Sequence, residues 1–336
     1  MRLEGIHVPV ITPFRSDYSV DEDLYAAMIE HLVDQGVHGL VVGGTTGENY
    51  AMSPEERIRQ FSFAHDVIDG RVPWTAGVND IRTEQVCEFA IEAKDAGADA
   101  ILLAIPPYSV PNQKELAAHA LRVDQASGLP IVLYNFPARS GAEMGHEFLE
   151  RVARSANFVA IKESAGDIGR VHMLAREFPH LQLSCGADDL ALEFFAWGAQ
   201  SWVCAAANFF SAECLLLFES CALNSDFVTG RRLMKAMMPV MTVLERSGKF
   251  VQCVKYGCEL DGLPAGESVR LPLRPMKKEL KRTLRDAIVT ARTTISRITA
   301  SARRGDEAPG NGEKPGGRSK RAPIASASGK RGTTNG

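Results

Sequence analysis

The chain has 336 residues, of which 45% are hydrophobic and 24% are charged. This is an ordinary soluble composition, and it provides enough chain for one large domain or two small ones. The formal net charge of -3 gives no reason to expect a nucleic-acid partner. No uninterrupted apolar segment is long enough to cross a bilayer. We therefore expect no specific nucleic-acid partner and no membrane association.

The seven cysteines are scattered along the chain and odd in number. None belongs to a CxxC motif, and no His/Cys cluster has the spacing of a zinc site. Cys185 and Cys204 sit in apolar runs, which favours buried, reduced thiols over disulfides. The acidic pair at Asp188 and Asp189 fits the first turn of a helix better than a metal site. The N-terminus also lacks a signal-peptide pattern, so we expect a cytoplasmic protein. From the Cys, His and Asp spacing we expect no metal.

From about residue 5 to residue 205 the sequence repeats one unit: a short apolar run, a loop and an amphipathic stretch. In chain order, the predicted strands are His7–Ile11, Gly39–Val42, Val72–Ala76, Ala100–Ala104, Ile131–Tyr134, Phe158–Ile161, Leu181–Ser184 and Ser201–Cys204. The predicted helices between them include Asp21–Gln35, Pro54–Ile68, Thr83–Ala96 and Lys114–Ala126.

Helix start and stop signals agree with this division. Ser53 is a good N-cap, and Pro54 suits the first helical position. Glycines close the predicted helices at positions 36, 70, 97 and 128. Apolar strands separated by helices indicate a parallel sheet covered by helices. Eight such units predict an α/β protein with a (β/α)8 barrel rather than an open sheet, since no GxGxxG follows the first strand.

The chain changes character after the eighth unit. Four helices and no strand are predicted next: Phe209–Leu223, Phe227–Glu245, Lys249–Leu260 and Lys277–Ile298. From Ser301 onward the sequence is rich in Gly, Ser, Ala, Pro, Lys and Arg, which predicts a disordered basic tail. A solvated tail is favoured over weak contact with a polyanion. The expected organisation is a barrel over residues 1–208, a helical region over 209–299 and the tail over 300–336.

The functional groups of such a barrel lie at the C-terminal ends of the strands and in the loops that follow them. Lys162 comes directly after the apolar run Phe158–Ile161. An amine at the rim of an apolar barrel is partly desolvated, which favours the neutral, nucleophilic form that attacks a ketone to give an imine. The alternative is a lysine that reaches solvent or pairs with Glu163.

Four other strand ends carry candidate side chains. Tyr134 could carry a proton, and Arg139 could bind a carboxylate through its fork of donors. Thr45 and Thr46 lie in a glycine-rich turn whose N–H groups and hydroxyls suit an anion. Tyr108 places another phenol on the same rim. Each of these residues alone also fits a packing or loop role, but together they predict an active site.

Three motifs in this set are similar to those of a known family. The segments Gly44–Glu48, Tyr134–Pro137 and Ile161–Glu163 resemble, in order and spacing, the dihydrodipicolinate synthase / N-acetylneuraminate lyase family. The resemblance covers about residues 3–295. It implies a class I lyase that binds pyruvate or a related 2-oxo acid as a Schiff base, without a metal or organic cofactor. It also implies a homo-oligomer, with a tight dimer inside a tetramer.

The resemblance also implies a role for each matching residue. Lys162 would form the Schiff base, and Tyr134 would be the proton shuttle above it. Thr45 and Tyr108 would form a proton relay, in which the neighbouring subunit of the dimer supplies the tyrosine. The pyruvate carboxylate would be held by Thr45 and Thr46, while the backbone at two further positions would border the site, Gly186 and Val203.

Within the family, Arg139 resembles the synthase branch, where the arginine at this place binds the carboxylate of aspartate semialdehyde. This implies an activity of the 4-hydroxy-tetrahydrodipicolinate synthase type. Pro107 replaces a tyrosine of that branch, and Asn49 and Tyr50 replace a small pair. A catabolic 2-keto-3-deoxy sugar acid aldolase or dehydratase, or a pyrroline-4-hydroxy-2-carboxylate deaminase, therefore remains an alternative. A non-catalytic binding barrel is disfavoured because all four catalytic side chains are present.

Overall fold

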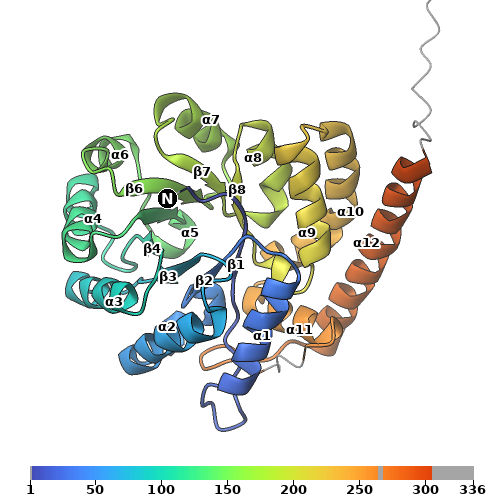
Figure 1. The fold of residues 1–336 in the computed structure, drawn as a ribbon, viewed down its shortest axis with the longest axis horizontal. Helices are drawn as coiled ribbons and strands as arrows, with labels where there is room; N and C mark the ends of the chain where they lie inside the picture. The colour runs from blue at the N-terminus through green and yellow to red at the C-terminus, as the bar shows by residue number, and fades with distance from the viewer. Residues whose placement is uncertain (1, 264–267, 305–336) are drawn as a thin grey trace, which may run out of the picture. The chain divides into compact units, whose positions relative to one another are not determined.

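The computed structural model describes residues 2–263 and 268–304. Eight parallel strands close into a barrel in the order β1 to β8, with the helices outside them (Figure 1). The predicted (β/α)8 barrel is therefore confirmed. The strands are β1 (Gly5–Pro9), β2 (Gly39–Val42), β3 (Trp74–Gly77), β4 (Ala100–Ala104), β5 (Ile131–Asn135), β6 (Phe158–Glu163), β7 (Gln182–Cys185) and β8 (Ser201–Val203).

The helices follow the strands as a (β/α)8 barrel requires, and additional helices follow β8. They are α1 (Glu22–Asp34), α2 (Pro54–Ile68), α3 (Thr83–Asp95), α4 (Gln113–Ser127), α5 (Pro137–Ser140), α6 (His146–Val152), α7 (Ile168–Glu177), α8 (Ala191–Ala196), α9 (Ser211–Phe218), α10 (Phe227–Arg246), α11 (Phe250–Leu260) and α12 (Lys278–Arg304). Short helical turns are η1 (Thr45–Gly47), η2 (Asn49–Ala51), η3 (Asp188–Leu190), η4 (Ala206–Asn208) and η5 (Glu219–Leu223).

The predicted start of α2 is confirmed at atomic detail. The Ser53 hydroxyl accepts a hydrogen bond from the Glu56 N–H at 3.2 Å, and the Glu56 carboxylate accepts one from the Ser53 N–H at 2.9 Å. This reciprocal pair satisfies two N–H groups that a helix start leaves without partners. It fixes the point at which the chain leaves the β2 loop and turns back along the barrel.

Two cores form on the two sides of the barrel wall. Residues that point inward form a small cluster: Leu3, Val41, Leu102, Val132, Tyr134, Ala160 and Val203. Residues that point outward, such as Leu133 and Ile161, pack against the helices in a much larger cluster. Because side chains alternate along a strand, Lys162 faces inward like Ala160, and Glu163 faces outward like Ile161.

The end of α12 corrects one prediction. The sequence places the end of the last helix at Ile298 and a disordered tail from Ser301, but α12 continues to Arg304. Alanine and arginine in this stretch are strong helix formers, and they extend the helix past the point where its apolar pattern ends. The rest of the predicted tail, residues 305–336, lies outside the described residues.

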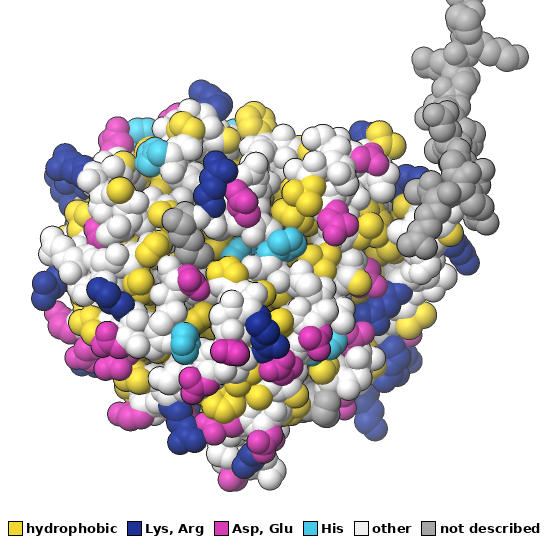
Figure 2. Space-filling model, in the orientation of Figure 1, with side chains coloured by type: hydrophobic (Ala, Val, Ile, Leu, Met, Phe, Trp, Pro, Cys, Tyr) yellow, Lys and Arg dark blue, Asp and Glu magenta, His cyan; other side chains and the backbone are white. Residues whose placement is uncertain are grey.

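The described surface mixes charges of both signs. Positive and negative side chains are interspersed over the face shown in Figure 2, with apolar side chains between them. No helix among residues 2–263 and 268–304 is both long and apolar enough to span a membrane.

Candidate active site

Lys162 and Tyr134 lie next to each other at the C-terminal end of the barrel. Tyr134 on β5 is the register partner of Lys162 on β6, and each residue is only 7% exposed. The Lys162 Nζ lies 4.1 Å from the centroid of the Tyr134 ring, within the range of a cation–π contact. Both strands extend past their predicted ends, so these two residues are held by the sheet rather than by a loop.

A cavity of about 210 Å³ surrounds the lysine. Its lining includes every residue that the sequence proposed for the site except Tyr108: Thr45, Thr46, Tyr134, Arg139, Lys162, Gly186 and Val203. A second cavity of about 480 Å³ shares Thr45, Tyr134 and Arg139 with the first. The site is thus a narrow region around the amine next to a wider one. Together the two regions give room for a small organic acid at the amine and for a second substrate beside it.

The close packing at Gly186 helps to set the position of the lysine. A Cβ atom at this position would lie 2.7 Å from Cγ and 2.9 Å from Cε of Lys162, and would also collide with Ser164. The Gly186 carbonyl accepts a hydrogen bond from the Ser164 hydroxyl at 2.8 Å. Only glycine allows the backbone to approach the lysine so closely.

The loop of Thr45 and Thr46 is anchored by a buried ion pair that the sequence did not reveal. Glu48 follows η1 in the left-handed conformation, with φ of 58°, and its Oε1 lies 2.6 Å from the Lys255 Nζ. Neither side chain is exposed. Burial lowers the pKa of Lys255, and the Glu48 carboxylate opposes this shift. The Lys255 ammonium also donates to the Ser268 carbonyl at 2.7 Å, so α11 holds the β2 loop in place.

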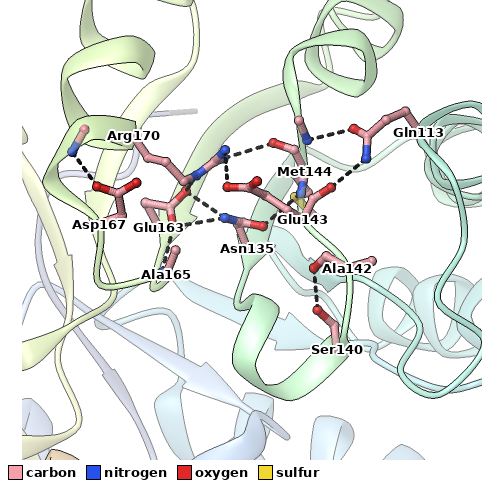
Figure 3. Close-up of polar contacts among 12 residues, drawn as sticks. Gln113, Asn135, Ser140, Ala142, Glu143, Met144, Glu163, Ala165, Asp167 and Arg170 are labelled. Carbon is pink, nitrogen blue, oxygen red and sulfur yellow. Dashed lines mark hydrogen bonds and ion pairs between the residues drawn. The ribbon is translucent and has the colours of Figure 1, made fainter.

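Glu163 does not pair with Lys162, which was one alternative from the sequence. It is buried on the outer side of the barrel wall in a hydrogen-bonded network (Figure 3). Its carboxylate accepts two bonds from the Asn135 side-chain amide, at 3.0 and 2.9 Å, and one from the Ala165 N–H at 2.7 Å. Arg170 donates to it from Nε at 2.9 Å.

The network continues from Arg170 to the loop before α6. Arg170 donates to the Met144 carbonyl at 2.9 Å and lies 2.5 Å from the Glu143 carboxylate. The Asn135 side-chain carbonyl accepts from the Met144 N–H at 2.9 Å. Two loops are thereby tied to the ends of β5 and β6. Asn135 follows Tyr134 on β5, and Glu163 follows Lys162 on β6. Because side chains alternate along a strand, both must point outward, and this alternation could have identified them from the sequence.

Arg139 lies on α5, directly after the end of β5. Its guanidinium carbon is 5.2 Å from the centroid of the Phe136 ring. Within the part of the chain that the structure describes, no carboxylate forms an ion pair with it. An exposed guanidinium that borders a cavity without a partner can bind the carboxylate of a ligand.

Tyr108 lies away from the cavity of its own chain. It is 93% exposed and has a φ of 73°, in the loop between β4 and α4. The side chains of Ile81 and Val110 are also exposed, at 59% and 55%. Large apolar side chains that stand free of the surface in this way are typical of an interaction site.

Two carboxyl groups at the cavity have shifted titration. Burial raises the pKa of Asp188 to about 6, although its oxygens accept bonds from the Trp202 indole at 2.9 Å and the Ala206 N–H at 3.0 Å. Burial also raises the pKa of Glu245 to about 7, assisted by the nearby carboxylates of Asp188 and Asp189. The helical turn that the sequence predicts at Asp188 and Asp189 is present as η3. The sequence did not identify Glu245, which reaches the cavity from α10.

A search for a metal-binding cluster of three or more His, Cys, Asp or Glu side chains finds none in the described ranges.

Comparison with known proteins places the chain in a family. The model of the dihydrodipicolinate synthetase family matches residues 2–291. The chain belongs to this family. It is 33% identical over 294 residues to the 4-hydroxy-tetrahydrodipicolinate synthase of Nitrobacter hamburgensis, a match that covers 86% of this chain and 97% of the relative. The chain is accordingly a lyase of the 4-hydroxy-tetrahydrodipicolinate synthase type.

Solved structures of family members have the same fold. The 4-hydroxy-tetrahydrodipicolinate synthase of Methylacidiphilum fumariolicum SolV aligns with a TM-score of 0.83 at 27% identity, over 89% of this chain and 99% of that chain. The protein YagE of E. coli K12, solved in complex with pyruvate, aligns with a TM-score of 0.81 at 26% identity, over 86% of this chain and 98% of that chain.

Proposed function

We propose that this lyase binds pyruvate as a Schiff base on Lys162 and condenses it with aspartate semialdehyde. The observation that carries the proposal is the buried amine of Lys162, held 4.1 Å from the Tyr134 ring centroid at a cavity of about 210 Å³. The pyruvate complex of YagE and the synthase names of the relatives support the choice of substrates.

The chemistry follows from the amine. The Lys162 nitrogen attacks the keto carbon of pyruvate, a C–N bond forms, and the keto oxygen leaves as water. The protonated imine that results draws electrons from the neighbouring methyl group, which loses a proton to give an enamine. The enamine carbon then attacks the aldehyde carbon, and the aldehyde oxygen takes up a proton. The product is now an imine on Lys162; the amino group of the former aldehyde substrate adds to the imine carbon, and Lys162 leaves as the free amine.

Tyr134 and Thr45 are proposed to move these protons. A phenol can both donate and accept a hydrogen bond, and Tyr134 lies beside the nitrogen that forms the imine. Thr45 and Thr46 line the same cavity, where their hydroxyl and N–H groups would hold the pyruvate carboxylate. Arg139 would bind the carboxylate of the aldehyde. Gly186 and Val203 would border the pyruvate with their backbone.

Reduction with borohydride tests the Schiff base directly. Incubation with pyruvate and borohydride should add one reduced three-carbon unit to the wild-type chain, located at Lys162 by peptide mass spectrometry. Lys162→Met should take up none, whereas Lys114→Met, which removes an exposed lysine, should be labelled like the wild type. A folded wild-type sample that remains unlabelled at Lys162 would refute the proposal.

A substrate panel tests the choice of aldehyde. Aspartate semialdehyde, a 2-keto-3-deoxy sugar acid and a pyrroline-4-hydroxy-2-carboxylate should be turned over by wild type and by Arg139→Ala. We expect the semialdehyde to be the best substrate, and we expect Arg139→Ala to raise its KM. Faster turnover of either other compound would instead favour the catabolic alternative.

We also propose that Tyr108 completes the site of a second copy in a homodimer, within a tetramer. Its side chain is 93% exposed, and the side chains of Ile81 and Val110 are also exposed. Lys162→Met and Tyr108→Phe would each inactivate every site of their own homodimer. Mixed dimers of the two variants would contain one intact site of two, so isolated mixed dimers should reach up to about half of the wild-type activity. No restoration in mixed dimers shown to form by mass spectrometry would contradict this arrangement.

A cytoplasmic location is the last part of the proposal. All seven cysteines are buried and free, and thiols persist in this state in a reducing compartment. Titration of the unfolded chain without reductant should find seven thiols per chain when the protein is purified from the cytoplasm.

A further inference from the structure

The cavity around Lys162 has a cation on one side and carboxyl groups on the other. Arg139 follows β5, Lys162 lies on β6, and Asp188 and Asp189 follow β7. Since these strands are consecutive neighbours in the barrel, the lysine lies between the guanidinium and the acids. Glu245 joins the acidic side from α10, and all of these residues line the same cavity of about 210 Å³.

Glu245 is the carboxyl group of this set that is best placed for a ligand. It is half-buried, and its carboxylate accepts a hydrogen bond from the Asp188 backbone N–H. Among residues 2–263 and 268–304, no Lys or Arg forms an ion pair with it. Asp188 differs, because its two oxygens are already bonded to Trp202 and Ala206.

Glu245, whose hydrogen-bond donor is the Asp188 backbone N–H, and the Arg139 guanidinium border one cavity. The charge of the half-buried Glu245 is costly without a counterion, and the exposed Arg139 guanidinium is open to an anion, so the site gains most from a ligand that carries both charges. Such a ligand carries a carboxylate for Arg139 and a cation for Glu245. A keto sugar acid supplies the carboxylate but only neutral hydroxyl groups, whereas an α-amino acid supplies both charges.

We propose that Glu245 binds the ammonium group of the second substrate, so that the enzyme selects an aldehyde with the carboxylate and ammonium of an α-amino acid. This inference rests on the proposed function and names the residue that recognises the aldehyde. Glu245 is a specificity-determining residue of the reaction and does not form the Schiff base.

The titration of Glu245 agrees with this role. Burial and the carboxylates of Asp188 and Asp189 raise its pKa to about 7, so it is about half charged near neutral pH. The other titratable groups that face it are Lys162 on β6 and Cys185 on β7. A bound ammonium favours the charged form of the carboxyl, so the preference for the amino-acid aldehyde should increase between about pH 6 and pH 8.

Two aldehydes that differ only in the ammonium group separate this role from a structural one. Aspartate semialdehyde carries the group, and succinic semialdehyde lacks it. The ratio of their kcat/KM values cancels the fraction of folded enzyme, because both are measured on the same sample. The variants are Glu245→Gln, which keeps the size of the side chain, and Glu193→Gln, which makes the same change at an exposed position on α8.

We expect the wild type and Glu193→Gln to prefer aspartate semialdehyde strongly. Glu245→Gln should lose roughly 10- to 100-fold of this preference, the range expected when a hydrogen bond to a charged group is lost. Glu245→Gln should still be labelled by pyruvate and borohydride at Lys162. Normal labelling with an unchanged ratio of the two aldehydes would overturn the inference and leave the proposed function intact. Absence of labelling in the wild type would overturn the proposed function itself.

Discussion

Replacing Arg170, the cation of the Glu163 network, should destabilise the protein more than neutralising Glu163 itself. The Arg170 side chain is 9% exposed and that of Glu163 is not exposed. Arg170→Met leaves a buried carboxylate with only the neutral donors of Asn135 and Ala165. Breaking a buried ion pair in this way costs about 3–5 kcal/mol. Glu163→Gln is milder, because Arg170 keeps the Glu143 carboxylate, and it should cost about 2–3 kcal/mol.

The same variants should also change catalysis through the position of Lys162. Glu163 is its neighbour on β6, and displacing a reacting group by about 1 Å can lower a rate about 100-fold. We therefore expect Arg170→Met, under conditions where it is folded, to trap pyruvate about 10- to 100-fold more slowly than the wild type. The substitution touches no residue of the cavity lining, so this loss would arise from positioning alone.

Urea unfolding measures the first effect, with the same protein concentration for every variant. Glu147→Gln is the matched control, because it removes the acid of an exposed pair in which the Arg151 nitrogen lies 2.8 Å from the carboxylate. Such a pair contributes about 0–0.5 kcal/mol. The double variant of Glu163 and Arg170 should cost less than the sum of the single ones. A cost below about 1 kcal/mol for Arg170→Met, or a larger cost for Glu163→Gln, would refute this reasoning.

Three further outcomes are expected. Lys255→Met breaks the buried ion pair and leaves the Glu48 carboxylate with the Arg270 N–H as its donor; it should cost about 3–5 kcal/mol in urea unfolding, and adding Glu48→Gln should recover part of this. Gly186→Ala places a methyl group 2.7 Å from Cγ of Lys162 and should lower the rate of borohydride trapping at least about tenfold, with little change in the far-ultraviolet circular dichroism. Burial lowers the pKa of His119 to about 4, so the unfolded chain takes up this proton at a higher pH than the folded chain. Stability should fall by roughly 1.4 kcal/mol per pH unit from about pH 6.5 toward 4, and His119→Gln should reduce this slope in urea unfolding.

The barrel could be predicted because its strands are buried on both faces. Such strands are continuous apolar runs between glycines and helix caps, and these signals are local in sequence. The boundaries of the functional strands were less accurate. The predicted strands stop at Tyr134 and Ile161, before the polar residues, yet Asn135 and Glu163 both belong to the sheet. Their polar groups are satisfied by the network behind the barrel wall, which no local pattern reveals.

The positions of seven of the eight proposed site residues around one cavity follow from topology. Parallel strands of a closed barrel bring their C-terminal ends together, so residues far apart in sequence meet there without further information. Lys255, the ion-pair partner of Glu48, and the cavity residue Glu245 could not be found in this way. Lys255 and Glu245 come from helices after the barrel, and the place where an added helix packs depends on side-chain fit rather than on a repeating pattern.

The two strands that carry the reacting groups show why fold and chemistry are coupled here. Along β5 the inward Tyr134 is followed by the outward Asn135, and along β6 the inward Lys162 is followed by the outward Glu163. Asn135 donates to Glu163 behind the wall, while the two inward side chains meet in the cavity. A shift of one strand past its neighbour by one residue would break the buried bond and also turn the amine away from the cavity. The same register therefore serves stability and catalysis, and a change that disturbs one should disturb the other.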